Sequence, residues 1–161
     1  MNPSSATPHF ERPAPVLFLD FDGVLHPNLA TPEQRFVRLP MLANALGDSE
    51  VQIIVSSSWR FEWSLERLKA LFPEPIRTRV VGTTGPAYIG RHARWNEIKS
   101  YCSDHRLNNW RALDDALFEF PNPCEQLIHC EGSRGIGQAQ CDALKAWLIG
   151  NESSTLRFKT P

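Results

Sequence analysis

Short apolar runs alternate with amphipathic patterns along this chain. Runs rich in β-branched residues at 16–20 and 51–56 are typical of buried parallel strands, and weaker runs follow at 79–83, 110–113 and 126–130. Apolar residues at helical spacing predict helices near 41–46, 65–72, 94–105 and 139–148, the last ending at a Gly150 cap. This alternation predicts an α/β fold, a three-layer Rossmann-like parallel sheet with helices on both faces.

The chain length predicts a single domain, because 161 residues can bury one sizeable core. We expect residues 1–14 to form a flexible lead-in, residues 15–150 the domain, and residues 151–161 a polar tail. The formal charge of −1 argues against a broad surface for nucleic acid or acidic membrane, although a local basic groove is compatible with it.

Two further features bear on the compartment. No apolar run approaches the roughly 20 residues of a membrane span, and the polar, proline-containing N-terminus does not resemble a secretory signal. The four cysteines form no C-x-x-C pair, which gives a zinc site little support and favours reduced, mostly buried thiols. We therefore expect a cytoplasmic protein without membrane partners.

Polar residues follow three of the apolar runs. The first run ends in Asp20-Phe-Asp22-Gly23, the second in Ser56-Ser57-Ser58-Trp59-Arg60, and the fourth in Asp114-Asp115. Parallel strands bring their carboxyl ends to one edge of a sheet, where ligands bind in open α/β folds. We expect these residues to share one crevice.

That combination of residues suits phosphoryl transfer to a carboxylate. Gathered acids repel one another unless a divalent cation neutralises them, and hard oxygen ligands suit Mg²⁺. A carboxylate nucleophile divides the reaction into two steps, and a second acid can protonate the leaving oxygen and then activate water. A strand-end serine and nearby backbone amides can hold the phosphoryl oxygens, while a cation balances their charge.

Structural roles for the same residues remain open. Asp20 and Asp22 could lie in a solvated turn, one of the three serines could cap a helix, and Asp114-Asp115 could cap another. Gly132-Ser-Arg-Gly135-Ile-Gly137 lacks the G-x-G-x-x-G spacing of a nucleotide loop, so we interpret it as a turn.

The motifs resemble those of the haloacid dehalogenase (HAD) superfamily. Asp20-Phe-Asp22-Gly-Val is similar to its first motif, D-x-D-G-x-[TV], Ser56 to its second and Asp114-Asp115 to its fourth. Phe-Leu-Asp-Phe-Asp-Gly-Val-Leu-His-Pro, Val-Ser-Ser-Ser-Trp-Arg and Ala-Leu-Asp-Asp more closely resemble the small branch found in bacterial multidomain "Swiss Army Knife" RNA-repair proteins.

The resemblance implies a role for each motif residue. Asp20 would be the nucleophile and a metal ligand, and Asp22 the general acid/base, lending a backbone carbonyl to Mg²⁺. Ser56 would bind the phosphoryl group, and Asp114 and Asp115 would complete the metal site. For the third-motif cation we choose Arg94, with Arg91 and Lys99 as alternatives.

Other candidates lie beside these motifs. We expect Gly23, Ser57 and Arg60 to bind substrate, Arg60 by reaching into the crevice. His26 departs from the family pattern, and we favour an ordinary loop residue over a hydrogen-bonding partner of the site.

The short segments between the motifs leave no room for a cap domain, so we expect an open site. An open crevice favours substrates that supply their own bulk, and our preferred substrate is a terminal phosphate on RNA or DNA. A phosphoprotein, a small phosphorylated metabolite, a substrate handed over by a protein partner, or a non-catalytic phosphate-binding role are the alternatives.

Overall fold

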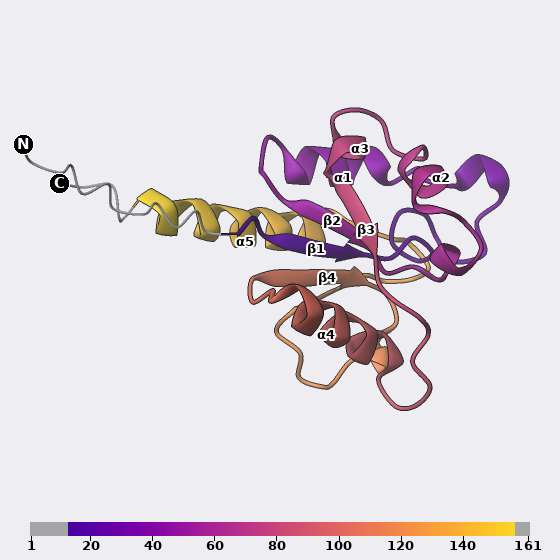
Figure 1. The fold of residues 1–161 in the computed structure, drawn as a ribbon. Helices are drawn as coiled ribbons and strands as arrows, with labels where there is room; N and C mark the ends of the chain where they lie inside the picture. The colour runs from indigo at the N-terminus through magenta and orange to yellow at the C-terminus, as the bar shows by residue number, and fades with distance from the viewer. Residues whose placement is uncertain (1–12, 157–161) are drawn as a thin grey trace, which may run out of the picture.

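The computed structural model describes residues 13–156, and its centre is a five-stranded parallel sheet of order β3-β2-β1-β4-β5 (Figure 1). The strands are β1 (Val16–Leu19), β2 (Gln52–Val55), β3 (Val80–Thr83), β4 (Trp110–Asp114) and β5 (Leu127–His129). All five predicted strands and the parallel α/β fold are thereby confirmed. Residues 1–12 of the expected lead-in and 157–161 of the expected tail lie outside the described residues.

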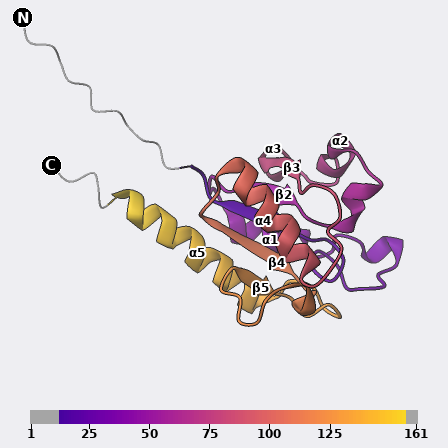
Figure 2. The same cartoon turned by 60° about the horizontal axis from the view of Figure 1, so that its bottom comes forward.

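Helices cover both faces of this sheet (Figures 1 and 2). The helices are α1 (Leu39–Leu46), α2 (Leu65–Lys69), α3 (Ile76–Arg79), α4 (Ala93–His105) and α5 (Gln138–Leu156), with 3₁₀ turns η1 (Pro32–Gln34), η2 (Ser58–Phe61) and η3 (Leu117–Glu119). Apolar residues of α1, α2, α3 and α5 pack in one core, and those of α4 pack in a second core on the other face.

The prediction that Gly150 ends the last helix is wrong. Gly150 lies inside α5, which continues to Leu156, so the first residues of the expected polar tail are helical. A glycine ends a helix only where the backbone turns into the left-handed conformation, whereas in a helix interior it lowers stability by about 1 kcal/mol without breaking the helix. Figure 2 shows α5 running out beyond the sheet.

The register of the sheet aligns the ends of the three motif-bearing strands. Leu19 pairs with Val55 of β2 on one side and with Leu113 of β4 on the other. The backbone N–H of Asp20 donates to the carbonyl of Leu113, and that of Ser56 donates to the carbonyl of Leu19. Asp20, Ser56 and Asp114 therefore lie side by side at one edge of the sheet.

Within the described part of the chain, nothing larger than a short segment enters the two places where a cap could be inserted. The first holds a loop, η1 and α1, and the second, 84–92, is a loop. Among the described residues no cap domain therefore covers the carboxyl ends of the strands, as expected. All four cysteines are free, and Cys102, Cys130 and Cys141 are buried. No described helix is long and apolar enough to cross a membrane.

Candidate active site

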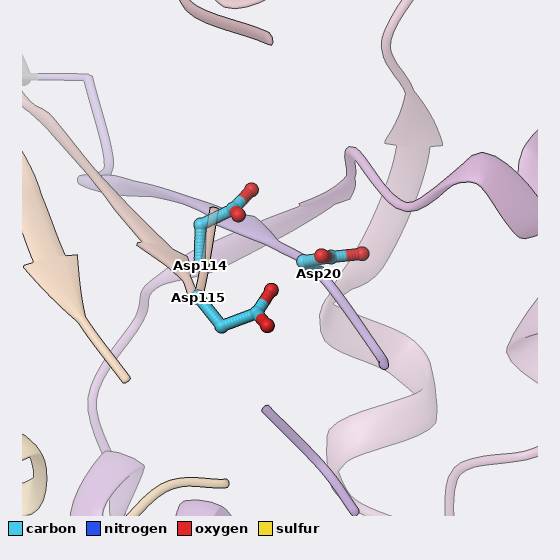
Figure 3. A group of neighbouring side chains, drawn as sticks. All are labelled: Asp20, Asp114 and Asp115. Carbon is cyan, nitrogen blue, oxygen red and sulfur yellow. The ribbon is translucent and has the colours of Figure 1, made fainter. Parts of the chain in front are cut away.

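Three carboxyl groups meet where β1 and β4 end (Figure 3). Asp20 follows β1, Asp114 is the last residue of β4 and Asp115 is the next residue. One oxygen atom from each group lies within 4.8 Å of the other two. Asp20 and Asp114 are buried, whereas Asp115 is partly exposed, so the cluster opens to solvent on the Asp115 side.

Burial makes negative charge at this cluster unfavourable. It raises the pKa of Asp20, although the Arg94 guanidinium opposes the rise. Burial and the neighbouring Asp20 charge raise the pKa of Asp114 to about 7. Two buried carboxyl groups with raised pKa values beside a third acid indicate a site that requires positive charge.

Arg94 supplies part of that charge. One guanidinium nitrogen, Nη1, lies 3.6 Å from Asp20 Oδ1 and 3.3 Å from Asp114 Oδ2. Burial lowers the pKa of Arg94, but the charges of Asp20, Asp114 and Glu97 outweigh this effect and raise it, so the side chain is permanently cationic. Arg94 is the second residue of α4, and its side chain reaches Asp20 after β1 and Asp114 at the end of β4.

The carboxylate cluster fits a magnesium ion. Asp114 Oδ1 accepts a hydrogen bond from the backbone N–H of Ala116, but Asp114 Oδ2 is buried without a hydrogen-bond partner. A buried acceptor left without a hydrogen bond is costly, and a cation bound between carboxylates removes that cost. Asp20, Asp114 and Asp115 supply the hard oxygen atoms that Mg²⁺ prefers.

We expect Mg²⁺ to stabilise the protein more strongly at pH 8 than at pH 5.5. The folded-state pKa of Asp114 lies above its ordinary value, so without metal the contribution of Asp114 to stability is fully present below its unfolded pKa of about 4 and is lost as pH rises through about 7. Mg²⁺ binds ionised carboxylates and must displace this proton at pH 5.5. At a concentration of 100 Kd, Mg²⁺ should raise Tm by about 5–10 °C at pH 8.

Differential scanning fluorimetry at matched ionic strength measures this effect, and Asp114→Asn serves as the control. The variant should lose most of the Mg²⁺-induced shift. Equal shifts at both pH values in the natural protein, or none at either, would contradict the assignment.

The side chain of Asp22 lies apart from the acidic cluster. Its carboxylate accepts a hydrogen bond from Trp59 Nε1 at Oδ2 (2.8 Å) and another from His26 Nε2 at Oδ1 (2.9 Å). His26 Nδ1 accepts the backbone N–H of Phe36, so the imidazole proton must be on Nε2, which donates to Asp22. The carboxylate itself is half exposed. Asp22 is therefore held in place by two donors while still facing solvent.

The interpretation of His26 as an ordinary loop residue is wrong. The residue is 1% exposed, and both ring nitrogens form hydrogen bonds, one of them with Asp22.

The strand-end serines have different surroundings. Ser56 Oγ is buried without a hydrogen-bond partner at the end of β2. Ser57 caps η2, because its hydroxyl accepts the backbone N–H of Trp59, and Ser57 also lowers the pKa of Asp20, which indicates that its hydroxyl lies close by. Thr84, which follows β3, also has a buried hydroxyl without a partner. Unpartnered hydroxyls at a sheet edge are available to the oxygens of a ligand.

Glycine at two positions allows Asp115 to approach the first motif. A Cβ atom on Gly23, which has a φ of +72°, would lie 2.2 Å from Asp115 Oδ2, and one on Gly132 would lie 2.4 Å from the same atom. Asn28 Nδ2 donates to Asp115 Oδ2 at 2.7 Å, and Asn28 N–H donates to the carbonyl of Gly132. The glycine-rich segment is a turn, as the spacing predicted, and the structure shows in addition that Gly132 within it leaves room for Asp115.

We expected Arg60 to reach into the crevice and bind substrate, but its guanidinium is bound within the protein. Its guanidinium donates to the carbonyls of Ser56, Ser57 and Gly85 and to Glu97 Oε2, and the side chain is 2% exposed. Glu97 Oε1 also accepts the backbone N–H of Tyr88, and Glu97 Oε2 lies 3.8 Å from Arg94 Nε. The Arg60–Glu97 pair therefore holds the loops after β2 and β3 in place and supports Arg94.

We expect Arg60→Met to lower the free energy of unfolding by about 3 kcal/mol, because it leaves the Glu97 carboxylate buried without its main partner. Urea denaturation measures this change. If Arg60 instead contacted substrate, the variant would fold with normal stability and show a raised KM.

Sequence reasoning did not identify Asn28, Glu97 or Thr84. Glu97 could have been found, because it lies three residues after Arg94 and so shares a face of the same helix. Asn28 and Thr84 carry no comparable signal, since only the turn after β1 and the end of β3 bring them to the site.

Comparison with known proteins adds one match. Residues 16–141 match the family model described as the HAD domain in Swiss Army Knife RNA repair proteins. This match covers most of the chain and includes every site residue discussed above. No match was found among curated proteins or solved structures.

Proposed function

Because the chain belongs to the family of HAD domains in Swiss Army Knife RNA repair proteins, we propose that it is a Mg²⁺-dependent phosphomonoester hydrolase acting through an aspartyl-phosphate. The observation that carries the proposal is the meeting of three carboxyl groups with one buried arginine at the end of the central strand. Among the described residues, Arg94 is the cation that forms an ion pair with Asp20.

Asp20 is the proposed nucleophile. Its carboxylate oxygen attacks phosphorus, and the bond from phosphorus to the leaving oxygen breaks, which gives an alcohol and a phosphorylated Asp20. Bound Mg²⁺, held by Asp20, Asp114, Asp115 and the backbone carbonyl of Asp22, would supply charge neutralisation of the phosphoryl group. Arg94 stabilises the negative charge that develops on the transferring oxygens.

Asp22 is the proposed general acid and base. It lies two residues after the nucleophile, is half exposed, and receives hydrogen bonds that fix its orientation. It protonates the leaving oxygen in the first step and takes a proton from water in the second. Ser56, Ser57 and the backbone N–H of Gly23 are proposed to hold the phosphoryl oxygens.

Terminal phosphates on RNA or DNA are the proposed substrates. The family description names RNA repair, and the open crevice accepts a phosphate at the end of a large molecule. Arg91 is exposed on the loop that leads into α4 and gives modest local positive charge. The near-neutral total charge argues for contact with an end rather than with an extended strand.

Phosphate release tests the proposal. The purified protein is incubated with Mg²⁺ and with 3′- and 5′-phosphorylated oligonucleotides, nucleotides, phosphopeptides and sugar phosphates, each repeated with excess chelator. We expect chelator-sensitive release that is fastest from the oligonucleotide ends. Release that is fastest from phosphopeptides or sugar phosphates would reject terminal phosphates on RNA or DNA as the substrate. No release from any of these compounds would favour a non-catalytic binding role.

His26 and Trp59 offer a test of the role of Asp22. We expect His26→Phe, which removes one donor to Asp22, to slow hydrolysis of alkyl phosphates about tenfold, because a misplaced acid loses part of its contribution. Hydrolysis of p-nitrophenyl phosphate, whose leaving group needs little protonation, should fall less than about threefold. Trp59→Phe removes the other donor and should show the same pattern. Equal slowing of both substrates would contradict the role.

A further inference from the structure

A pocket of about 440 Å³ opens beside the carboxylate of Asp22. Its lining includes Asp22, Arg35, Trp59, Phe61, Glu62 and Trp63, which come from the loop after β1 and from the segment that follows β2. The acidic cluster does not line this pocket. It is therefore a cavity adjoining the proposed general acid, separate from the carboxylates that would hold the metal.

The chemistry of the proposed reaction determines which part of a substrate lies there. Asp22 gives its proton to the oxygen that leaves phosphorus, so the alcohol portion of the substrate must lie against Asp22. Trp59, which donates to Asp22 Oδ2, is itself a wall of the pocket. Trp59 thus both orients Asp22 and forms a wall of the pocket beside it.

Three of the residues that line the pocket are aromatic. The rings of Trp59 and Trp63 lie 5.0 Å apart between centroids, tilted by 57°. Phe61 is 53% exposed, and the Arg60 guanidinium lies over its ring at 4.1 Å. Trp59 and Trp63 are half-buried. The exposed parts of aromatic rings are surfaces on which planar groups stack.

Charged groups accompany these rings. The guanidinium carbon of Arg35, an exposed residue, lies 5.5 Å from the centre of the Trp59 ring, and Glu62 lines the same pocket. An arginine beside an aromatic platform suits a planar group that carries a neighbouring phosphate. A carboxylate at the same pocket can accept hydrogen bonds from hydroxyl or amino groups.

We propose that this pocket binds the nucleoside from which the terminal phosphate is removed, with the base stacked on the aromatic walls and the adjoining phosphodiester, where there is one, paired with Arg35. The inference rests on the proposed phosphatase function. The P–O bond to the nucleoside breaks as the P–O bond to Asp20 forms, and the Asp22 proton goes to the nucleoside oxygen. The nucleoside then leaves with a free hydroxyl group.

A phenol such as phosphotyrosine is the main competing occupant. A phenol has a pKa of about 10, so it leaves phosphorus readily and needs little help from a general acid. Asp22, which two hydrogen bonds hold in place, would then contribute little to the reaction. A sugar hydroxyl is a poorer leaving group and depends on that acid much more. A sugar with its base is also larger than one phenol ring and so occupies more of a pocket of about 440 Å³. The nucleoside is thus the better fit.

Matched substrates with and without a base test the proposal. One pair is adenosine 5′-monophosphate and ribose 5-phosphate, and the other is an oligonucleotide whose terminal phosphate is on an adenosine or on an abasic sugar. We expect kcat/KM to be at least about tenfold higher for the member with the base, since stacking of one base is worth about this factor. The two pairs distinguish a mononucleotide from a nucleic-acid end.

Phe61→Ala should lower the ratio of kcat/KM with the base to kcat/KM without it about fivefold or more. Phe118→Ala should leave this ratio unchanged. Phe118 is a 78% exposed phenylalanine on η3 that does not line the pocket, which makes it a matched control. Arg35→Gln should reduce the preference for oligonucleotide over mononucleotide and weaken its dependence on salt.

Equal rates with and without the base, an unchanged ratio in Phe61→Ala, or fastest release from a phosphotyrosine peptide would overturn the assignment of the pocket. In each of those cases phosphate is still released, so the proposed phosphatase activity survives, although fastest release from a phosphotyrosine peptide also rejects the proposed nucleic-acid substrate. No release from any substrate would instead reject the proposed function, so the two failures are distinguishable.

Discussion

Replacing Asp20 with asparagine is expected to lower phosphate release by about three orders of magnitude or more, because the amide cannot form the covalent intermediate. Asp20 lies at the end of the central strand, its oxygen is within 4.8 Å of those of Asp114 and Asp115, and Arg94 is 3.6 Å away. Its position is central to the site, so no neighbouring carboxylate can take its place. Initial rates of phosphate release with saturating Mg²⁺ measure the loss.

The fold of this variant should remain intact. Asparagine removes a buried charge that raises the pKa of Asp114, so the repulsion between the two groups falls. Asp48→Asn changes an exposed aspartate away from the site and is the matched control, with unchanged activity expected. Acid quenching during turnover should trap a hydroxylamine-sensitive phosphoprotein from the natural protein and none from Asp20→Asn. Residual activity near the natural level would eliminate Asp20 as the nucleophile.

Replacing Arg94 with glutamine is expected to lower kcat about a hundred- to a thousandfold, the range seen when a single group that stabilises transition-state charge is removed. Arg94 contacts both Asp20 and Asp114 and lies on a helix start that faces the crevice. Without its charge, the two buried carboxylates and an incoming phosphate repel one another. Steady-state kinetics with the best substrate should show the loss mainly in kcat.

The two other cations considered from the sequence are the controls. Arg91 is exposed, and Lys99 Nζ lies over the Trp95 ring, 5.7 Å from its centre. Arg91→Gln and Lys99→Gln should each change kcat less than about threefold. A loss of the expected size in either variant, together with near-normal activity in Arg94→Gln, would show that the third-motif cation had been misassigned. Arg94→Lys should recover part of the activity, because it keeps the charge and loses the planar fork.

The strands and the order of the motifs could be predicted because both depend on local sequence. Buried parallel strands are continuous apolar runs, and each run here ends at the residue where the polar motif begins. The helix end at Gly150 could not be predicted in the same way. A glycine is compatible with both a cap and a helix interior, and the rest of the helix decides between them.

The roles of individual charged side chains depended on partners distant in sequence. Arg60 follows the second motif directly, so we expected it to bind substrate. Its guanidinium instead donates to the carboxylate of Glu97, 37 residues later. His26 looked like a loop residue until the Phe36 backbone and Asp22 were found on its two nitrogens. Hydrogen-bonding capacity is limited, so a side chain satisfied inside the protein is not available to a ligand.

By itself, the sequence predicted the parallel α/β fold, the HAD family and a set of carboxylates and serines at the ends of neighbouring strands, because strand ends are encoded by neighbouring residues. The tertiary structure decided which cation faces Asp20, which donors hold Asp22, and that a pocket with three aromatic walls adjoins that acid. These features depend on distances between loops that follow different strands, and only the packed chain specifies those distances.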